Sequence, residues 1–134
     1  MNQKDIEKIY IVYVAGPYRA DSEWGIRKNI EKCANRAMEV WETAKGGWPR
    51  AVAVTPCMNT SFFGGTVPDS VWLDGYLSLL LRCDAIIMAD GWENSSGSLA
   101  EIRFAEENNI PVFYSTDDLV HWMDEKDSKL GIKR

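Results

Sequence analysis

The stretch KIYIVYVAGP near the start of the chain constrains the fold more than any other feature. After Lys8, β-branched and aromatic residues follow one another without a charge until Gly16 and Pro17 stop the run. A run of this kind is typical of a strand that is buried on both faces. We therefore predict a strand over residues 9–15, which requires neighbouring strands and helices on both sides of a sheet.

Helical and strand patterns alternate along the rest of the chain. Apolar or small residues recur with a period near 3.6 over residues 24–44, which predicts an amphipathic helix that ends at Gly46 and Gly47. The remaining helices are predicted over residues 68–80, 98–109 and 117–130, and the remaining strands over 51–56, 84–90 and 110–115. Residues 57–68 show no periodicity, and a loop of that length suggests a binding role. This alternation predicts an α/β fold, a Rossmann-like (flavodoxin-like) parallel sheet of about four to five strands with helices on both faces.

Length, charge and cysteine content exclude several classes of protein. A chain of 134 residues suits a single domain over residues 1–134. The net charge of −5 argues against binding a nucleic acid polymer, although a free nucleotide needs only a local positive site. Three cysteines without a C-x-x-C pair, together with one histidine, give no metal site, and no apolar run is long enough to cross a membrane. The odd cysteine count and the lack of a basic-then-apolar leader favour a cytoplasmic protein.

The first and third predicted strands point to a binding site. In open parallel sheets, ligands bind at the carboxyl ends of the strands, where the strand order reverses. The first strand ends in the turn GPYR, where backbone N–H groups near Gly16 and the guanidinium of Arg19 suit a phosphate. The alternative is a plain turn with a solvated arginine, because neither G-x-G-x-x-G nor the Walker pattern occurs.

The segment DGWENSSGSLAE after the third predicted strand contains Glu101, for which two roles are possible. Ser98 and Glu101 have the spacing of a capping box that starts a helix. Ser95, Gly97 and Ser98 lie where a helix N-terminus favours an anion, and we expect the same field to keep Glu101 ionised at neutral pH. An ionised Glu101 suits a nucleophile as well as a cap, and spacing does not separate the two roles.

Three further residues are weaker candidates. Asp74 lies within a predicted helix and is either functional or simply an exposed polar residue. Asp90, at the carboxyl end of the third strand, is well placed for a ligand. Trp92 follows it, and its ring either stacks on a base or covers the core.

The segments IYIVYVAGPYR and RCDAIIMADGWENSSGSLAEIRFAEENNIPVF resemble the nucleoside 2-deoxyribosyltransferase superfamily, which includes deoxynucleoside 5′-monophosphate N-glycosidases. The most specific part is S-x-G-x-x-x-E, read here as Ser95, Gly97 and Glu101. The resemblance implies that Glu101 attacks the anomeric carbon, that Tyr13 orients it and that Ser95 holds a 5′-phosphate. It further implies that Arg19 lies in a phosphate-contacting turn and that Asp74 assists proton transfer to the base.

The resemblance implies cleavage or transfer at the N-glycosidic bond of small deoxynucleosides or their 5′-monophosphates. The expected intermediate is a covalent deoxyribosyl-enzyme, and no metal or redox cofactor is needed. A homodimer or larger homo-oligomer is expected, with the apolar residues Phe62, Phe63 and Trp72 as candidate interface residues. Because fold alone does not determine function, two alternatives stay open. One is a non-catalytic nucleotide-binding or sensing module, and the other is a scaffold in which SLAE is only a helix cap.

Overall fold

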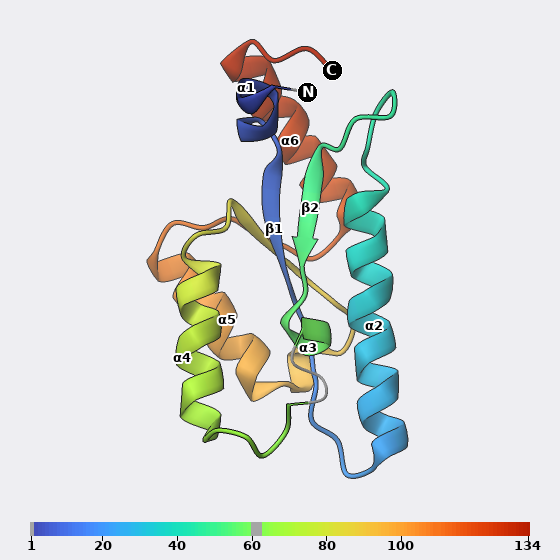
Figure 1. The fold of residues 1–134 in the computed structure, drawn as a ribbon, viewed down its shortest axis with the longest axis vertical. Coiled ribbons are helices and arrows are strands. Elements are labelled where there is room, and N and C mark those ends of the chain that lie inside the picture. The colour runs from blue at the N-terminus through green and yellow to red at the C-terminus, as the bar shows by residue number, and fades with distance from the viewer. Residues whose placement is uncertain (1, 60–62) are drawn as a thin grey trace.

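The computed structural model describes residues 2–59 and 63–134. The elements in chain order are α1 (Gln3–Glu7), β1 (Tyr10–Ala15), α2 (Glu23–Trp41), β2 (Ala51–Val54), α3 (Pro56–Asn59), α4 (Asp69–Leu80), β3 (Ala85–Met88), the 3₁₀ helix η1 (Trp92–Asn94), α5 (Ser96–Glu107), β4 (Val112–Phe113) and α6 (Thr116–Leu130). Figure 1 shows the sheet between two groups of helices. The described residues form an α/β fold compatible with the predicted Rossmann-like (flavodoxin-like) class.

The sheet in this part of the chain has four parallel strands in the order β2-β1-β3-β4. Parallel strands need crossover connections, which α2, α4 and α5 supply. The order reverses between β1 and β3, because the chain moves to β2 on one side of β1 and to β3 and β4 on the other. The carboxyl ends of β1 and β3, where we predict a binding site, therefore lie next to each other.

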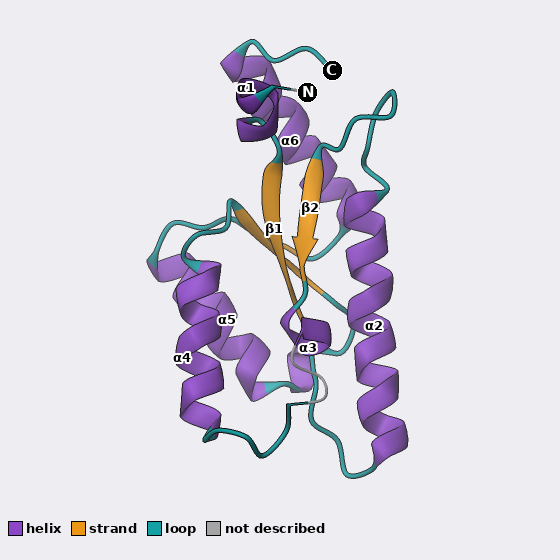
Figure 2. Cartoon of the chain, viewed as in Figure 1, coloured by secondary structure: helices purple, strands orange, loops and turns teal. Residues whose placement is uncertain are grey.

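Helices cover both faces of the sheet (Figure 2). Successive β1 side chains point to opposite faces. Val12 and Val14 pack in one buried cluster with residues of α2 and α6. Tyr13 and Ala15 pack in the other cluster with residues of α4 and α5. Any functional side chain that reaches Tyr13 must therefore come from the face covered by α4 and α5.

Most element boundaries differ from the sequence-based prediction by one to a few residues, and three differences matter. Helix α1 and η1 were not predicted. The predicted loop over residues 57–68 begins inside α3, and residues 60–62 of that loop are outside the described residues. Helix α5 begins at Ser96 rather than at the predicted Ser98, which changes how Glu101 is read.

A buried polar cluster lies where β1 and β2 begin. Asp127 of α6 accepts hydrogen bonds from the Tyr10 hydroxyl (2.6 Å), from Arg50 (3.2 Å) and from Nε of Arg134 (2.7 Å). Arg50 is 2% exposed and also binds Asp124 at 2.7 Å. Although burial opposes ionisation, the hydrogen bonds from Arg134 and Tyr10 hold the pKa of Asp127 below its usual range. This cluster ties α6 and the carboxyl-terminal tail to the sheet.

Candidate functional site

The turns after β1 and β3 are packed against each other. A Cβ atom added at Gly16 would lie 2.9 Å from both Ala89 Cβ and Cys33 Sγ, so no larger residue fits there without movement. Gly91 has φ +89°, a left-handed conformation that glycine adopts at little cost, and it faces the ring of Pro17. The two glycines let both strand ends meet at one edge of the sheet.

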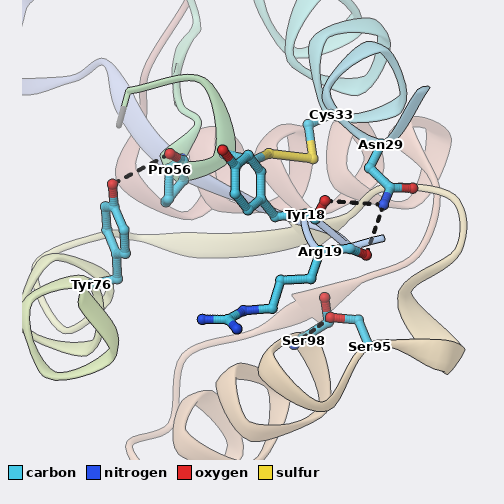
Figure 3. Close-up of a disulfide and its surroundings, with 9 residues drawn as sticks. Tyr18, Arg19, Asn29, Cys33, Pro56, Tyr76, Ser95 and Ser98 are labelled. Carbon is cyan, nitrogen blue, oxygen red and sulfur yellow. Dashed lines mark hydrogen bonds between the residues drawn. A yellow bond between two sulfur atoms is a disulfide. The ribbon is translucent and has the colours of Figure 1, made fainter. Parts of the chain in front are cut away.

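The turn that carries Arg19 is held by α2. The side-chain amide of Asn29 donates to the carbonyl oxygens of Tyr18 and Arg19, both at 3.2 Å. The Arg19 guanidinium is exposed and forms an ion pair of 2.5 Å with Asp69 at the start of α4. In Figure 3 its side chain extends from this turn toward the space between Tyr76 and the start of α5. Arg19 is therefore available to an anion, which would compete with Asp69.

Ser95, not Ser98, caps α5. Ser95 Oγ accepts a hydrogen bond from the backbone N–H of Ser98 at 3.1 Å. The predicted capping box of Ser98 and Glu101 is wrong, because S-S-G-S offers several possible cap serines and the helix starts at the earlier one. Ser98 instead lies inside the first turn, is 1% exposed, and its Oγ has no hydrogen-bond partner among the described residues.

Glu101 lies in the second turn of α5, beyond the turn where a helix dipole acts most strongly. It borders a buried stripe of the helix formed by Ser98, Ile102 and Ala105, and its own side chain is partly buried. Burial raises the pKa of the Glu101 carboxyl to about 7, with the Tyr13 hydroxyl partly offsetting this rise. Glu101 is therefore only partly ionised at neutral pH, so the prediction that the helix start keeps it ionised holds only in part.

Tyr13 of β1 is a residue of the sheet that interacts with Glu101. Its side chain is fully buried, and its hydroxyl forms no hydrogen bond of regular geometry with the residues described. Burial, followed by the Glu101 carboxylate, raises the pKa of the Tyr13 hydroxyl well above its ordinary value. The two side chains thus lie near enough for the pKa of each to depend on the other. This proximity was an expectation from the sequence resemblance alone.

Asp74 is exposed in the middle of α4 and has no hydrogen bond or ion pair with a described residue. Tyr76, two positions later, is partly buried and packs against the cluster that contains Tyr13. Its hydroxyl donates to the Pro56 carbonyl at 3.3 Å, as Figure 3 shows. The sequence analysis did not single out Tyr76. The sequence signal for its inward position was its place four residues before Leu80, on the same side of the helix.

The two remaining candidates at the β3 end have protein partners. Asp90 is 87% exposed and pairs with Arg36 at 3.7 Å. Trp92 in η1 lies against the ring of Tyr114, with centroids 4.9 Å apart, and packs on the α4–α5 face of the core. This contact favours the reading in which Trp92 covers the core.

Arg36 was missed by the sequence analysis. It lies on α2 and donates from Nε to the Met88 carbonyl at 3.0 Å and from a terminal nitrogen to the Tyr114 carbonyl at 3.4 Å. It therefore joins α2 to the ends of β3 and β4. The sequence signal was an arginine beside the buried positions Cys33 and Ala37.

A disulfide joins Cys33 of α2 to Cys57 of α3, with Cα atoms 7.0 Å apart. The cysteine count did not predict this pairing, since the two residues are 24 positions apart in the sequence. Cys83 is a free, buried thiol. The disulfide fixes α3, and with it Pro56, close to the turn after β1 (Figure 3).

A family model described as "Domain of unknown function (DUF4406)" matches residues 51–114. The matched segment runs from β2 to just after β4 and contains Asp74, Ser95 and Glu101 but neither Tyr13 nor Arg19. No curated protein matches the chain. The match marks α4, β3 and α5 as part of a recurring unit and assigns no activity.

Two searches of the described residues concern cofactors and membranes. No group of three or more His, Cys, Asp or Glu side chains within residues 2–59 and 63–134 is arranged to hold a metal ion. Across the same two ranges, no helix has both the length and the apolar character that a membrane span requires.

Proposed function

We propose that the protein cleaves or transfers the N-glycosidic bond of 2′-deoxynucleosides or their 5′-monophosphates, with Glu101 as the nucleophile. The observation that carries this proposal is the partly buried Glu101 carboxyl next to the buried Tyr13 hydroxyl, which has no other hydrogen-bond partner among the described residues, toward the end of the sheet where β1 and β3 end. Buried polar groups are normally hydrogen-bonded, and exceptions are frequent in functional sites.

The chemistry suits a carboxylate at this position. One oxygen of Glu101 forms a bond to C1′ while the C1′–N bond breaks and its electron pair leaves with the base. Water then releases the sugar in a hydrolase, or a second base takes it in a transferase. A pKa near 7 leaves a substantial ionised fraction at neutral pH, and the positive charge that develops on the sugar favours that ionised form.

The start of α5 supports recognition of a 5′-phosphate. Ser95 uses an oxygen lone pair for the cap and keeps its O–H for a ligand, while Gly97 in the first turn is exposed. Ser98 contributes a second unpaired hydroxyl. Arg19 supplies a cation on the opposite side. The resemblance of S-x-G-x-x-x-E to the nucleoside 2-deoxyribosyltransferase superfamily supports the same reading.

The resemblance also supports a homodimer or larger homo-oligomer. The cytoplasmic location predicted from the odd cysteine count stays a prediction, which the Cys33–Cys57 disulfide does not favour. Phe63 is 49% exposed, and its ring lies 6.3 Å from that of Trp72, which makes this pair a candidate contact between copies. Phe62, a further candidate from the sequence, lies outside the described residues.

The experiment is a screen for free base released from a panel of deoxynucleosides and deoxynucleoside 5′-monophosphates, each with a ribose counterpart. Wild type is compared with Glu101→Gln and with Glu106→Gln, an exposed residue of the same helix. We expect release by wild type and Glu106→Gln and none by Glu101→Gln. Binding of a nucleotide without release by wild type would replace this proposal with the sensing module, and full activity of Glu101→Gln would remove the nucleophile assignment.

A further inference from the structure

Helix α4 presents a single polar side chain to the core. Its other polar residues, Asp69, Ser70, Asp74 and Ser78, are all exposed, whereas Tyr76 is partly buried. Tyr76 packs on the cluster that contains Tyr13, and its phenol contributes to the raised pKa of Tyr13. The phenol of Tyr76, and not the carboxyl of Asp74, therefore faces the cluster that contains Tyr13.

One hydrogen bond of the Tyr76 hydroxyl is long. The hydroxyl donates to the carbonyl oxygen of Pro56 at 3.3 Å, which is long for an O–H···O hydrogen bond. In Figure 3 the Arg19 guanidinium lies between the phenol of Tyr76 on one side and Ser95 and Ser98 on the other. A sugar held over Glu101 with its 5′ end at Ser95 and Arg19 would direct its base away from the start of α5 and toward Tyr76 of α4.

We propose that the Tyr76 hydroxyl protonates the leaving base, and that Asp74 takes no part in that step. This inference rests on the proposed function. As the C1′–N bond breaks, the bonding pair moves onto the base, which accepts the phenolic proton, while Glu101 bonds to C1′. The resulting phenolate regains a proton from the water that later hydrolyses the glycosyl-enzyme, or from the incoming base in a transfer.

The test compares two leaving groups. One substrate is an ordinary purine deoxynucleotide, and the other is its N7-methylated counterpart, whose base leaves as a neutral molecule without needing a proton. We expect Tyr76→Phe to lower kcat on the ordinary substrate by about 10²- to 10⁴-fold and on the methylated substrate by less than about tenfold. Asp74→Asn should change neither rate, and Glu101→Gln should lose both.

The ratio of the two rates separates proton donation from a structural role. Tyr76→Phe keeps the ring, and the ratio does not depend on the fraction of protein that is folded. An equal loss on both substrates, or a leaving-group-dependent loss in Asp74→Asn, would overturn the assignment. A failure of the proposed function itself would show differently, as wild type releasing base from neither substrate.

Discussion

Buried polar groups are extensively hydrogen-bonded at the end of the sheet where the strands begin, and much less so at the end where the strands stop. Where the strands begin, Asp127 accepts hydrogen bonds from Tyr10, Arg50 and Arg134, and only Nε of Arg50 is left without a partner in the described residues. Where the strands end, the Ser98 hydroxyl lacks a partner among the described residues, and the Tyr13 hydroxyl has only the Glu101 carboxyl beside it.

The pKa values of the carboxyls Asp127 and Glu101 shift in opposite directions, in line with this difference in hydrogen bonding. Hydrogen bonds lower the pKa of Asp127 despite its burial, whereas burial raises the pKa of Glu101 to about 7. A paired buried charge holds a fold together, and an unpaired buried polar group has a free-energy cost that a ligand can offset. We infer that the first end serves stability and the second serves binding.

The largest expected effect comes from breaking the paired end. Asp127→Ala leaves Arg50 and Arg134 without their shared carboxylate and should lower the free energy of unfolding by about 3–5 kcal/mol. Denaturant titration measures this loss. Base release per folded molecule should be unchanged, because the cluster lies at the end of the sheet away from Glu101.

Asp124→Ala is the matched control. Asp124 shares Arg50 with Asp127 but is half exposed, so its loss should cost about 1 kcal/mol or less. If both variants lose the same stability, the paired end is not the stabilising cluster that we infer.

The next largest effect is a pH-dependent gain in stability when Glu101 is replaced. Since the folded state raises the pKa of Glu101 from 4.5 to about 7, native protein binds the extra proton between those values, and wild-type stability falls as pH rises through them. Glu101→Gln removes that loss. Its free energy of unfolding relative to wild type should therefore be similar below pH 4.5 and higher by at most about 3 kcal/mol above pH 7.

Glu106→Gln, exposed on the same helix, controls for the loss of a charge and should shift stability by less than about 0.5 kcal/mol at either pH. The measurement is thermal and denaturant unfolding of all three proteins at several pH values. A Glu101→Gln curve parallel to that of wild type would mean that burial does not penalise the charged carboxylate.

The smallest expected effect distinguishes a serine that only caps a helix from one that also contacts the ligand. Ser95→Ala and Ser22→Ala each remove a serine oxygen that accepts a helix N-terminal N–H, at 3.1 Å in α5 and at 3.0 Å in α2. Each should cost about 1 kcal/mol of stability. Only Ser95→Ala should also raise KM, and only for a 5′-monophosphate, because the nucleoside has no phosphate to bind.

Steady-state kinetics on the matched nucleoside and monophosphate check this difference. Equal KM changes on both substrates, or the same change in Ser22→Ala, would remove Ser95 from the phosphate site.

The fold was predictable because its signals are local. The apolar run of β1 and the period of α2 fix elements that then pack in the one way open to parallel strands. The reversal of strand order at β1 and β3 followed from that packing, so the edge of the sheet that holds Glu101 was also predictable.

The details of the site were less predictable, because they depend on contacts between distant residues. Three serines near Gly97 compete as caps, and sequence spacing favoured the wrong one, Ser98. The raised pKa of Glu101 arises from burial by other elements, which a helix-dipole argument does not include. Asp74 and Tyr76 differ by two positions on one helix, and only packing reveals which one faces Tyr13.

The most direct test of the nucleophile is intact-mass spectrometry of the protein quenched during turnover. A substrate analogue with fluorine at C2′ should slow breakdown of the glycosyl-enzyme, because an electron-withdrawing group destabilises the cationic transition state. We predict a mass increase of one sugar unit that maps to the peptide containing Glu101 and is missing in Glu101→Gln. A sugar adduct on another residue, or one that persists in Glu101→Gln, would contradict the account.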